Sequence, residues 1–312
     1  IPNRFPDSGE KPEYNTADAT LWMFQAVKSY LDAGGEAGFV RDVFYPAAKE
    51  ILDWHERGTL FGIGVDESDG LLRSGAPGTQ LTWMDAKVGD WVVTPRRGKP
   101  VEIQALWYNA LRLTADWAGA FGEVDTAREL QTKAERVQAS FHAKFWNAAR
   151  NCLYDGIGDD GPDAKLRPNQ IFAVSLTYPL LPSQEEQRAV VRIVEAELLT
   201  PVGLRTLERG DPGYKGRYEG GPLERDAAYH QGTVWPWLLG PFVAAYLRAF
   251  GRTPETLKRC RAWLKRLEEE LNHGCLGTVG EIYDGDSPHR PAGCPAQAWS
   301  VGEMLRIAAM VR

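Results

Sequence analysis

A helical repeat of apolar side chains is the feature that most constrains the fold of this chain. The clearest case spans residues 125–146, where apolar residues recur at steps of three and four and charged residues occupy the opposite face. The apolar positions are Ala127, Leu130, Ala134, Val137, Phe141 and Phe145. Because side chains three or four apart share one face of an α-helix, the pattern predicts an amphipathic helix packed against a core.

Two other helices carry recognisable starting signals. Ser183 and Glu186 form a capping box, which predicts a helix running to about Leu199. Pro254 fits the first position of another helix, which is expected to end at Gly274. Strand patterns are few and short. Applied to the whole chain, the same criteria predict helices near residues 17–32, 37–57, 100–121, 125–146, 168–181, 184–199, 227–250, 254–272 and 296–312.

The connections between these helices alternate in length. Short turns, such as those at residues 33–36, 122–123 and 181–182, join neighbouring helices, whereas long loops separate the pairs. The long loops lie near residues 58–99, 147–167, 200–226 and 273–295. A helical solenoid would show a fixed repeat period and short loops at both ends, and this sequence shows neither. We therefore expect an all-α toroid of paired helices whose loop-bearing end carries the active site.

Composition and charge exclude several classes of partner. The 42 acidic residues outnumber the 36 basic ones and no basic run occurs, so the sequence argues against binding to nucleic acid. The longest apolar run, Trp235 to Leu247, is interrupted by Gly240 and Pro241 and is too short for a membrane span. We expect neither nucleic acid nor a membrane as a partner.

The cysteines and the familiar cofactor motifs point to a reducing compartment and to no cofactor. The four cysteines, at positions 152, 260, 275 and 294, show no C-x-x-C spacing. Reduced thiols in the cytoplasm are the simpler interpretation, and no metal site is expected. The sequence also lacks a G-x-S-x-G elbow, a phosphate-binding G-x-x-x-x-G-K-[ST] loop and an H-E-x-x-H pair.

Two acidic residues stand out because each lies in a glycine-containing loop beside an aromatic residue. Asp85 follows Trp83, and Glu281 precedes Tyr283. Hydrolysis of a glycosidic bond needs two such carboxylates, one to protonate the leaving oxygen and one to activate water or attack the sugar. Solvated loop acids and helix-flanking caps are the alternative interpretations.

Other candidate residues surround the two acids in the predicted loops and at helix starts. Trp83 offers a flat face to a sugar ring, although simple burial would also explain it. Lys87 would hydrogen-bond a hydroxyl or remain solvated, and Glu102 would bind ligand or act as a helix-start acid. Asp18 and Trp22 lie four residues apart, on one helix face. The remaining candidates are His230, Gln231, Trp235 and Trp299.

Five ordered motifs resemble the C-terminal domain of glycogen debranching enzymes, the amylo-α-1,6-glucosidase family, over essentially the whole chain. They are Ile1-Pro-Asn-Arg-Phe-Pro-Asp7, Leu81-Thr-Trp-Met-Asp-Ala-Lys-Val-Gly-Asp90, Thr94-Pro-Arg with Gly98-Lys-Pro-Val-Glu-Ile103, Tyr229-His-Gln-Gly-Thr-Val-Trp-Pro236, and Glu281-Ile-Tyr-Asp-Gly-Asp286 with Ala296-Gln-Ala-Trp-Ser300. The resemblance implies an (α/α)6 toroid that removes the glucose left at an α-1,6 branch of a glycogen-like glucan, with inversion.

The resemblance also implies roles for individual residues. Asp85 matches the general acid of the family and Glu281 its general base. The motif positions implied to line the sugar pocket are Asp18, Trp22, Trp83, Lys87, Glu102, His230, Gln231, Trp235 and Trp299.

The chain departs from the family pattern at its N-terminus. It begins after a Trp-Gly-Arg-Asp loop that contributes to the glucose site in the family, so residues 1–312 are expected to form one catalytic domain lacking its first helices. We expect the exposed groove to be covered by self-association or by the missing segment. The rival interpretations are another α/α-toroid glucosidase, acting on an oligosaccharide or trehalose, and a glucan-binding module without activity.

Overall fold

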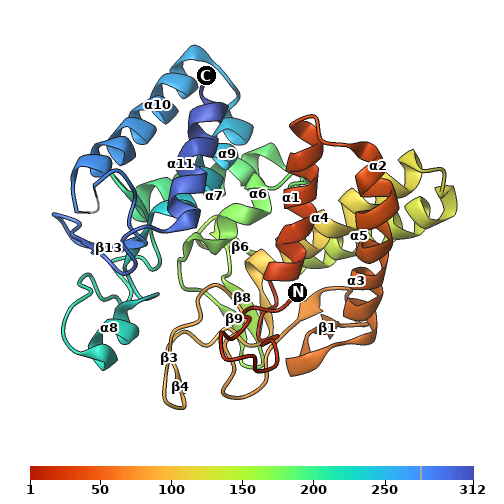
Figure 1. Cartoon of the computed structure of the whole chain (residues 1–312), viewed down its shortest axis with the longest axis horizontal. Helices are drawn as coiled ribbons and strands as arrows, with labels where there is room; N and C mark the ends of the chain where they lie inside the picture. The colour runs from red at the N-terminus through yellow and green to blue at the C-terminus, as the bar shows by residue number, and fades with distance from the viewer. Residues whose placement is uncertain (275) are drawn as a thin grey trace.

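Two groups of helices dominate the computed structural model, which describes residues 1–274 and 276–312 (Figure 1). The first group holds α1 (Ala19–Asp32), α2 (Ala37–Phe39), the π-helix η1 (Val40–Phe44), α3 (Tyr45–Arg57), α4 (Val101–Ala120) and α5 (Val124–Phe145). The second holds α7 (Gln184–Glu197), α9 (Leu239–Phe250), α10 (Pro254–Glu269) and α11 (Ala298–Met310). The short helix α6 (Phe172–Ser175) packs against both α4 and α9 and so joins the two groups.

One buried helix lies at the centre of each group. Helix α4 is buried on all sides and contacts α1, α3, α5 and α6. Helix α9 is nearly as buried and contacts α6, α7, α10 and α11. A helix buried all round is expected where a core surrounds it, whereas the outer helices keep one polar face. The two groups share a continuous apolar core.

Most of the predicted helices are confirmed, and they begin within about two residues of the predicted positions. The helix expected over 125–146 is α5, and its five buried side chains include Leu130, Val137 and Phe141. In α7 the Ser183 side chain accepts a hydrogen bond from the backbone N–H of Glu186, as the capping motif predicts. The helix expected over 254–272 is α10 followed by the 3-10 turn η5 (Glu270–Asn272).

Two predicted helices are wrong over much of their length. In the range 168–181 the chain forms only the 3-10 turn η3 (Pro168–Ile171) and α6, because Leu176 adopts extended backbone with ψ at 166°. In the range 227–250, α8 (Pro222–Ala228) ends early and a turn follows. Gly232 has φ at 141°, and a Cβ there would lie 2.5 Å from a backbone oxygen, so the helix cannot continue through it.

The prediction of an all-α toroid is wrong, because the segments between the helices form five small antiparallel sheets within the described residues. Four of these sheets are β1 (Gly64–Val65) with β2 (Leu72–Arg73), β3 (Lys87–Val88) with β4 (Trp91–Val92), β5 (Lys99–Pro100) with β8 (Gly156–Gly158) and β9 (Gly161–Asp163), and β6 (Trp146–Asn147) with β7 (Cys152–Leu153). Strands of two or three residues are too short to show the alternation that identifies a strand in a sequence.

The fifth sheet joins two of the long loops, near residues 200–226 and 273–295, through a strand from the range 227–250 that was expected to be helical. Its order is β10 (Leu199–Thr200), β11 (Gly203–Arg205), β12 (Val234–Trp235), β13 (Ile282–Tyr283) and β14 (Pro291–Ala292). Leu204 pairs with Trp235, and Val234 pairs with Tyr283. Because Glu281 directly precedes β13, this pairing brings two distant candidate residues, Trp235 and Glu281, to neighbouring strands.

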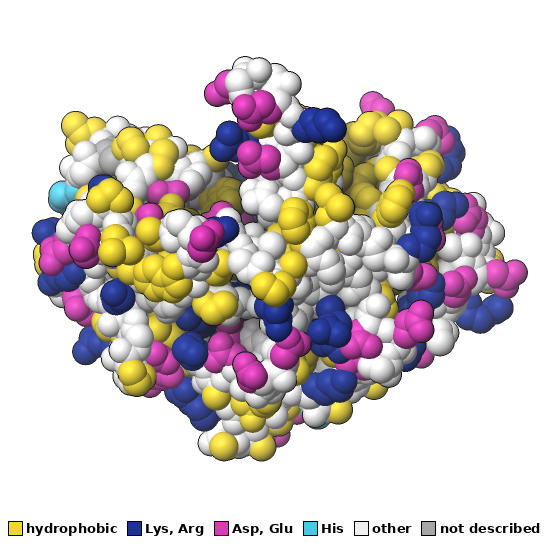
Figure 2. All heavy atoms as spheres, turned by 90° about the horizontal axis from the view of Figure 1, so that it is seen from below, with side chains coloured by type: hydrophobic (Ala, Val, Ile, Leu, Met, Phe, Trp, Pro, Cys, Tyr) yellow, Lys and Arg dark blue, Asp and Glu magenta, His cyan; other side chains and the backbone are white. Residues whose placement is uncertain are grey.

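The molecular surface is mixed in charge on the face seen in Figure 2, where acidic and basic side chains are interspersed. Every helix within residues 1–274 and 276–312 is too short or too polar to cross a membrane.

Candidate active site

A pocket of about 550 Å³ lies where α1, α11 and several of the long loops meet. Helix α1 and the turn before it contribute Asp18 and Trp22, and α11 contributes Trp299. Seven of the predicted site residues line this pocket together: Asp18, Trp22, Trp83, Asp85, Trp235, Glu281 and Trp299. The two carboxylates singled out from the sequence, nearly two hundred residues apart, therefore border one cavity.

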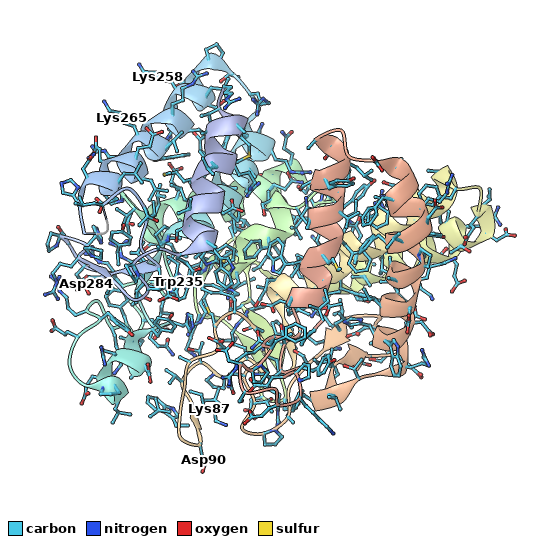
Figure 3. All side chains as sticks on the ribbon, viewed as in Figure 1. Lys87, Asp90, Trp235, Lys258, Lys265 and Asp284 are labelled. Carbon is cyan, nitrogen blue, oxygen red and sulfur yellow. The ribbon has the colours of Figure 1, made fainter. Side chains whose placement is uncertain are left out.

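Lys87 lies apart from the pocket lining. It begins strand β3, and its Nζ donates a hydrogen bond to the backbone oxygen of Gly78 at 3.0 Å. Figure 3 shows Lys87 on the β3–β4 hairpin at the lower edge of the molecule, with Trp235 near the centre. The hairpin carries the Lys87 side chain away from the cavity that Asp85, only two residues earlier, helps to line.

Glu102 also lies outside the pocket lining, in a buried network of charges beneath it. Its carboxylate forms an ion pair with Arg96, whose Nε lies 2.7 Å from Asp155. The side chains of all three residues are 5% exposed or less. Burial acts to lower the pKa of Arg96, but the carboxylates of Asp155 and Glu102 raise it above its ordinary value. Glu102 therefore neutralises a buried guanidinium.

The same network supports the loop that carries Asp85. Asp155 accepts a hydrogen bond from the amide nitrogen of Asn169 at 2.8 Å. The amide oxygen of Asn169 in turn accepts one from the indole N–H of Trp83, also at 2.8 Å. Arg96 reaches the same loop through the hydroxyl of Thr82, at 3.4 Å. Buried polar groups with partners hold one geometry, so the network fixes Trp83 and the residues that follow it.

Arg167 extends the network to the segment that contains His230 and Gln231. Its guanidinium donates to the backbone oxygen of His230 at 2.7 Å and to the side-chain oxygen of Gln231 at 2.9 Å. The amide nitrogen of Gln231 donates to the backbone oxygen of Val93 at 3.2 Å. Gln231 therefore connects three loops behind the pocket and does not line it.

Asp85 is half-exposed and lies against a buried histidine. Its Oδ1 is 3.6 Å from Nε2 of His230, slightly longer than a hydrogen bond. Burial lowers the pKa of His230, and the Asp85 carboxylate opposes that effect. The imidazole stacks on Trp235, with ring centroids 5.1 Å apart, and meets the edge of Trp83 at 5.3 Å. His230 is thus an aromatic neighbour of Asp85 behind the pocket wall.

Glu281 is held on both of its carboxylate oxygens. One oxygen accepts the backbone N–H of Cys294 at 2.9 Å, and the other accepts the side-chain amide of Gln297 at 3.2 Å. The Tyr229 hydroxyl is a third partner, because burial and a hydrogen bond to Glu281 raise the pKa of Tyr229. The coulombic effect of Asp85 acts in the same direction on this phenol, which lies within reach of both acids.

Asp18 is buried at the start of α1 and ties that helix to the Asp85 loop. It accepts a hydrogen bond from the Thr16 hydroxyl at 2.7 Å, and the backbone N–H of Trp83 also contacts it. A backbone hydrogen bond of 2.7 Å between Ala17 and Leu81 joins the same two segments. Burial raises the pKa of Asp18, and these hydrogen bonds only partly oppose it.

Several pocket residues were missed by the sequence analysis. Tyr229 and Gln297 lie in motifs quoted from the sequence, but polarity alone does not tell which motif position points inward. Trp237 stacks on Phe172 and meets the edge of Trp299, which adds a second aromatic wall. Glu303 is four residues after Trp299, and helical spacing alone signals that it shares the same face.

The pocket combines four carboxylates with several aromatic rings. The acids are Asp18, Asp85, Glu281 and Glu303, and no Lys or Arg side chain from the described part of the chain lines the cavity. Such a lining favours an uncharged polar ligand over an anionic one, because the latter would face only like charge. Aromatic faces and carboxylate acceptors together suit the C–H faces and hydroxyls of a sugar ring.

Comparison with known proteins places nearly the whole chain in one family. The family model described as amylo-alpha-1,6-glucosidase matches residues 1–306. A glycogen debranching enzyme of Saccharomyces cerevisiae is 27% identical over an alignment 334 positions long, which covers 79% of this chain and 22% of that protein. The chain therefore spans about a fifth of the length of this curated relative.

Two solved structures have a similar fold at low sequence identity. A sialidase aligns with a TM-score of 0.70 and 15% identity, covering 96% of this chain and 26% of that chain. The GH78 family rhamnosidase of Bacillus sp. GL1 aligns with a TM-score of 0.59 and 16% identity, covering 95% of this chain and 26% of that chain. These similarities concern the fold alone.

Proposed function

From the premise that this chain belongs to the amylo-alpha-1,6-glucosidase family, we propose that it is a glycoside hydrolase that releases glucose from the α-1,6 branch points of glycogen-like glucans. The observation that carries the proposal is the shared cavity: Asp85 and Glu281 line one pocket with the rings of Trp22, Trp83 and Trp299. A cavity of about 550 Å³ suits one or a few sugar rings.

In the proposed mechanism the two acids have different catalytic roles. Asp85 protonates the oxygen of the departing glucan, and Glu281 activates a water molecule on the opposite face of the sugar. The environment of Glu281 supports the role of base, because the backbone N–H of Cys294 and the Gln297 amide donate to its two carboxylate oxygens and hold the side chain in one orientation at the pocket wall. The exposure of Asp85 suits contact with a leaving group that extends into solvent.

Glucose release from a branched limit dextrin tests the proposal. Asp85→Asn and Glu281→Gln should each lower the turnover number by at least about 100-fold, because general acid or base catalysis contributes on that order or more. Asp90→Asn, on the exposed β3–β4 hairpin of the same loop, is the matched control and should keep the wild-type rate. Near-wild-type activity of either acid variant would remove that residue from the mechanism.

The stereochemistry of the product tests the inverting mechanism separately. Proton NMR of freshly released sugar should show β-glucose first from an α-linked substrate. Early α-glucose would indicate a retaining enzyme. Cleavage of trehalose or an unbranched oligosaccharide in place of the limit dextrin would favour the rival glucosidase, and glucan binding without cleavage would favour a binding module.

A cytoplasmic location belongs to the same proposal. Cys152, Cys260 and Cys294 carry free thiols, which is compatible with the reducing compartment expected from the sequence. Cys275 lies outside the described residues.

A further inference from the structure

Helix α11 brings a fourth carboxylate, Glu303, into the pocket. Glu303 lines the same cavity as Asp85 and Glu281. It follows Trp299 by four residues, so the ring and the carboxylate occupy successive turns on one face of the helix. An aromatic platform with a hydrogen-bond acceptor one turn away presents both an apolar face and a polar edge to a ligand.

The neighbouring helix α9 leaves room for this carboxylate. A Cβ at Gly240 would overlap the Glu303 carboxylate and would lie 3.1 Å from the Arg306 guanidinium. Gly240 is the second residue of α9 and faces α11. Its φ is not positive, so the backbone conformation does not require glycine, and space for the Glu303 carboxylate is the structural reason for glycine at this position.

Arg306 fixes one oxygen of Glu303 and leaves the other available. Its Nε and Nη2 lie 2.8 Å and 2.7 Å from Oε2 of Glu303. Within residues 1–274 and 276–312, the hydrogen bonds of Glu303 all reach Oε2, which leaves Oε1 as an acceptor. Burial raises the pKa of Glu303 and Arg306 opposes that effect.

We propose that Glu303 is a specificity-determining residue, whose carboxylate accepts a hydrogen bond from one hydroxyl of the sugar ring held in the pocket. This inference rests on the proposed function for the nature of the ligand. A simple surface ion pair between residues three apart on a helix is the alternative. Such a pair neither needs a glycine on the next helix nor faces a cavity, and it contributes little.

A series of deoxy sugars tests the contact. The values of kcat/KM are measured for an aryl α-glucoside and for its 2-, 3-, 4- and 6-deoxy analogues, with wild type and Glu303→Ala. Because the substitution removes a hydrogen bond to a charged group, Glu303→Ala should lower kcat/KM for the parent glucoside by roughly 10- to 100-fold. For one analogue, which lacks the hydroxyl bound by Glu303, the same substitution should have almost no effect.

Two further variants separate a pocket contact from a folding defect. Gly240→Ala inserts a methyl group where the carboxylate lies, so it should reproduce the deoxy-sugar pattern while Glu303 itself is unchanged. Asp125→Ala breaks an exposed ion pair with Arg128 on α5, far from the pocket lining, and should leave every rate unchanged. Equal losses for all five substrates in both Glu303→Ala and Gly240→Ala would overturn the contact.

The outcomes also distinguish this inference from the proposed function. Equal losses for every sugar, with activity still dependent on Asp85, would remove the role of Glu303 and keep the hydrolase. If wild type binds glucose without cleaving any glucoside, the hydrolase proposal fails, and calorimetric titration with glucose and the deoxy sugars applies the same test to Glu303. Failure of wild type to bind any of these sugars would overturn both.

Discussion

Removing either partner of the buried pair between Arg96 and Glu102 should strongly destabilise the protein. The guanidinium is 5% exposed and the carboxylates of Glu102 and Asp155 are 2% exposed, so water cannot replace a lost partner. Surface pairs contribute about 0–1 kcal/mol, but breaking a buried pair costs about 3–5 kcal/mol, because a charge is left without compensation. We expect the latter for Arg96→Met and for Glu102→Met.

The double variant should be less damaging than the sum of the two single changes. Removal of both partners leaves Asp155 with Arg167, whose Nε lies 3.8 Å away, and the remaining charges balance. Urea unfolding followed by tryptophan fluorescence gives the free energy of each variant, and the cycle should show a coupling of at least about 2 kcal/mol.

The control is the exposed pair Arg128 and Asp125, in which both side chains are more than two-thirds exposed. Its removal should change the free energy of unfolding by less than about 0.5 kcal/mol. Additive effects in the Arg96 and Glu102 cycle, or single losses below about 1 kcal/mol, would show that solvent reaches the network and would refute the reasoning.

Three further predictions concern other parts of the molecule. Because burial raises the pKa of Asp18, its carboxyl group binds a proton more tightly in the folded state than in the unfolded chain, and the stability that this proton contributes is lost as pH rises above 3.8. Between about pH 4 and about pH 7, the urea midpoint of wild type should therefore fall relative to that of Asp18→Asn. Burial raises the pKa of Cys260 to about 11, so an alkylating reagent at about pH 8 should modify exposed Cys294 much faster than Cys260, and peptide mapping at successive times measures both rates. Gly232→Ala forces a side chain into positive φ against backbone and should lower the free energy of unfolding by ~1–3 kcal/mol, whereas Gly210→Ala, with open space, should change it little.

Helix prediction succeeded where a local signal decided the structure. Ser183 caps α7 through a bond to a residue three positions later, and the apolar stripe of α5 repeats over six turns. The sheets were missed because their pairing is non-local. Val234 is paired with Tyr283, nearly fifty residues away, and neither strand is long enough to reveal an alternating pattern. The all-α prediction was therefore wrong in the loops.

Residue type identified the polar and aromatic residues near the candidate site but not their orientation. Glu102 and Gln231 belong to the segments that build the pocket, yet both point into buried contacts, with Arg96 and Arg167. The contact of Gln231 with Arg167, 64 residues away, and the link from Arg96 to Asp155, 59 residues away, depend on distant segments meeting, which no local pattern encodes. Glu303, in contrast, lines the pocket from the middle of a helix. The roles of Asp85 and Glu281 stay predictions until the variants are measured.

The pocket draws its walls from almost the entire length of the chain, from Asn3 and Asp18 near one end to Glu303 near the other. Loop closure over such sequence separations is entropically costly and slows folding. During refolding from urea, the local helices α5 and α10 should therefore form well before the cavity exists. Ligand binding or catalytic activity, measured at successive times, should return only with the slowest phase, after helical circular dichroism has largely recovered. The site would thus report on completion of the whole fold, and partly folded chains would be inactive even when most of their helices are in place.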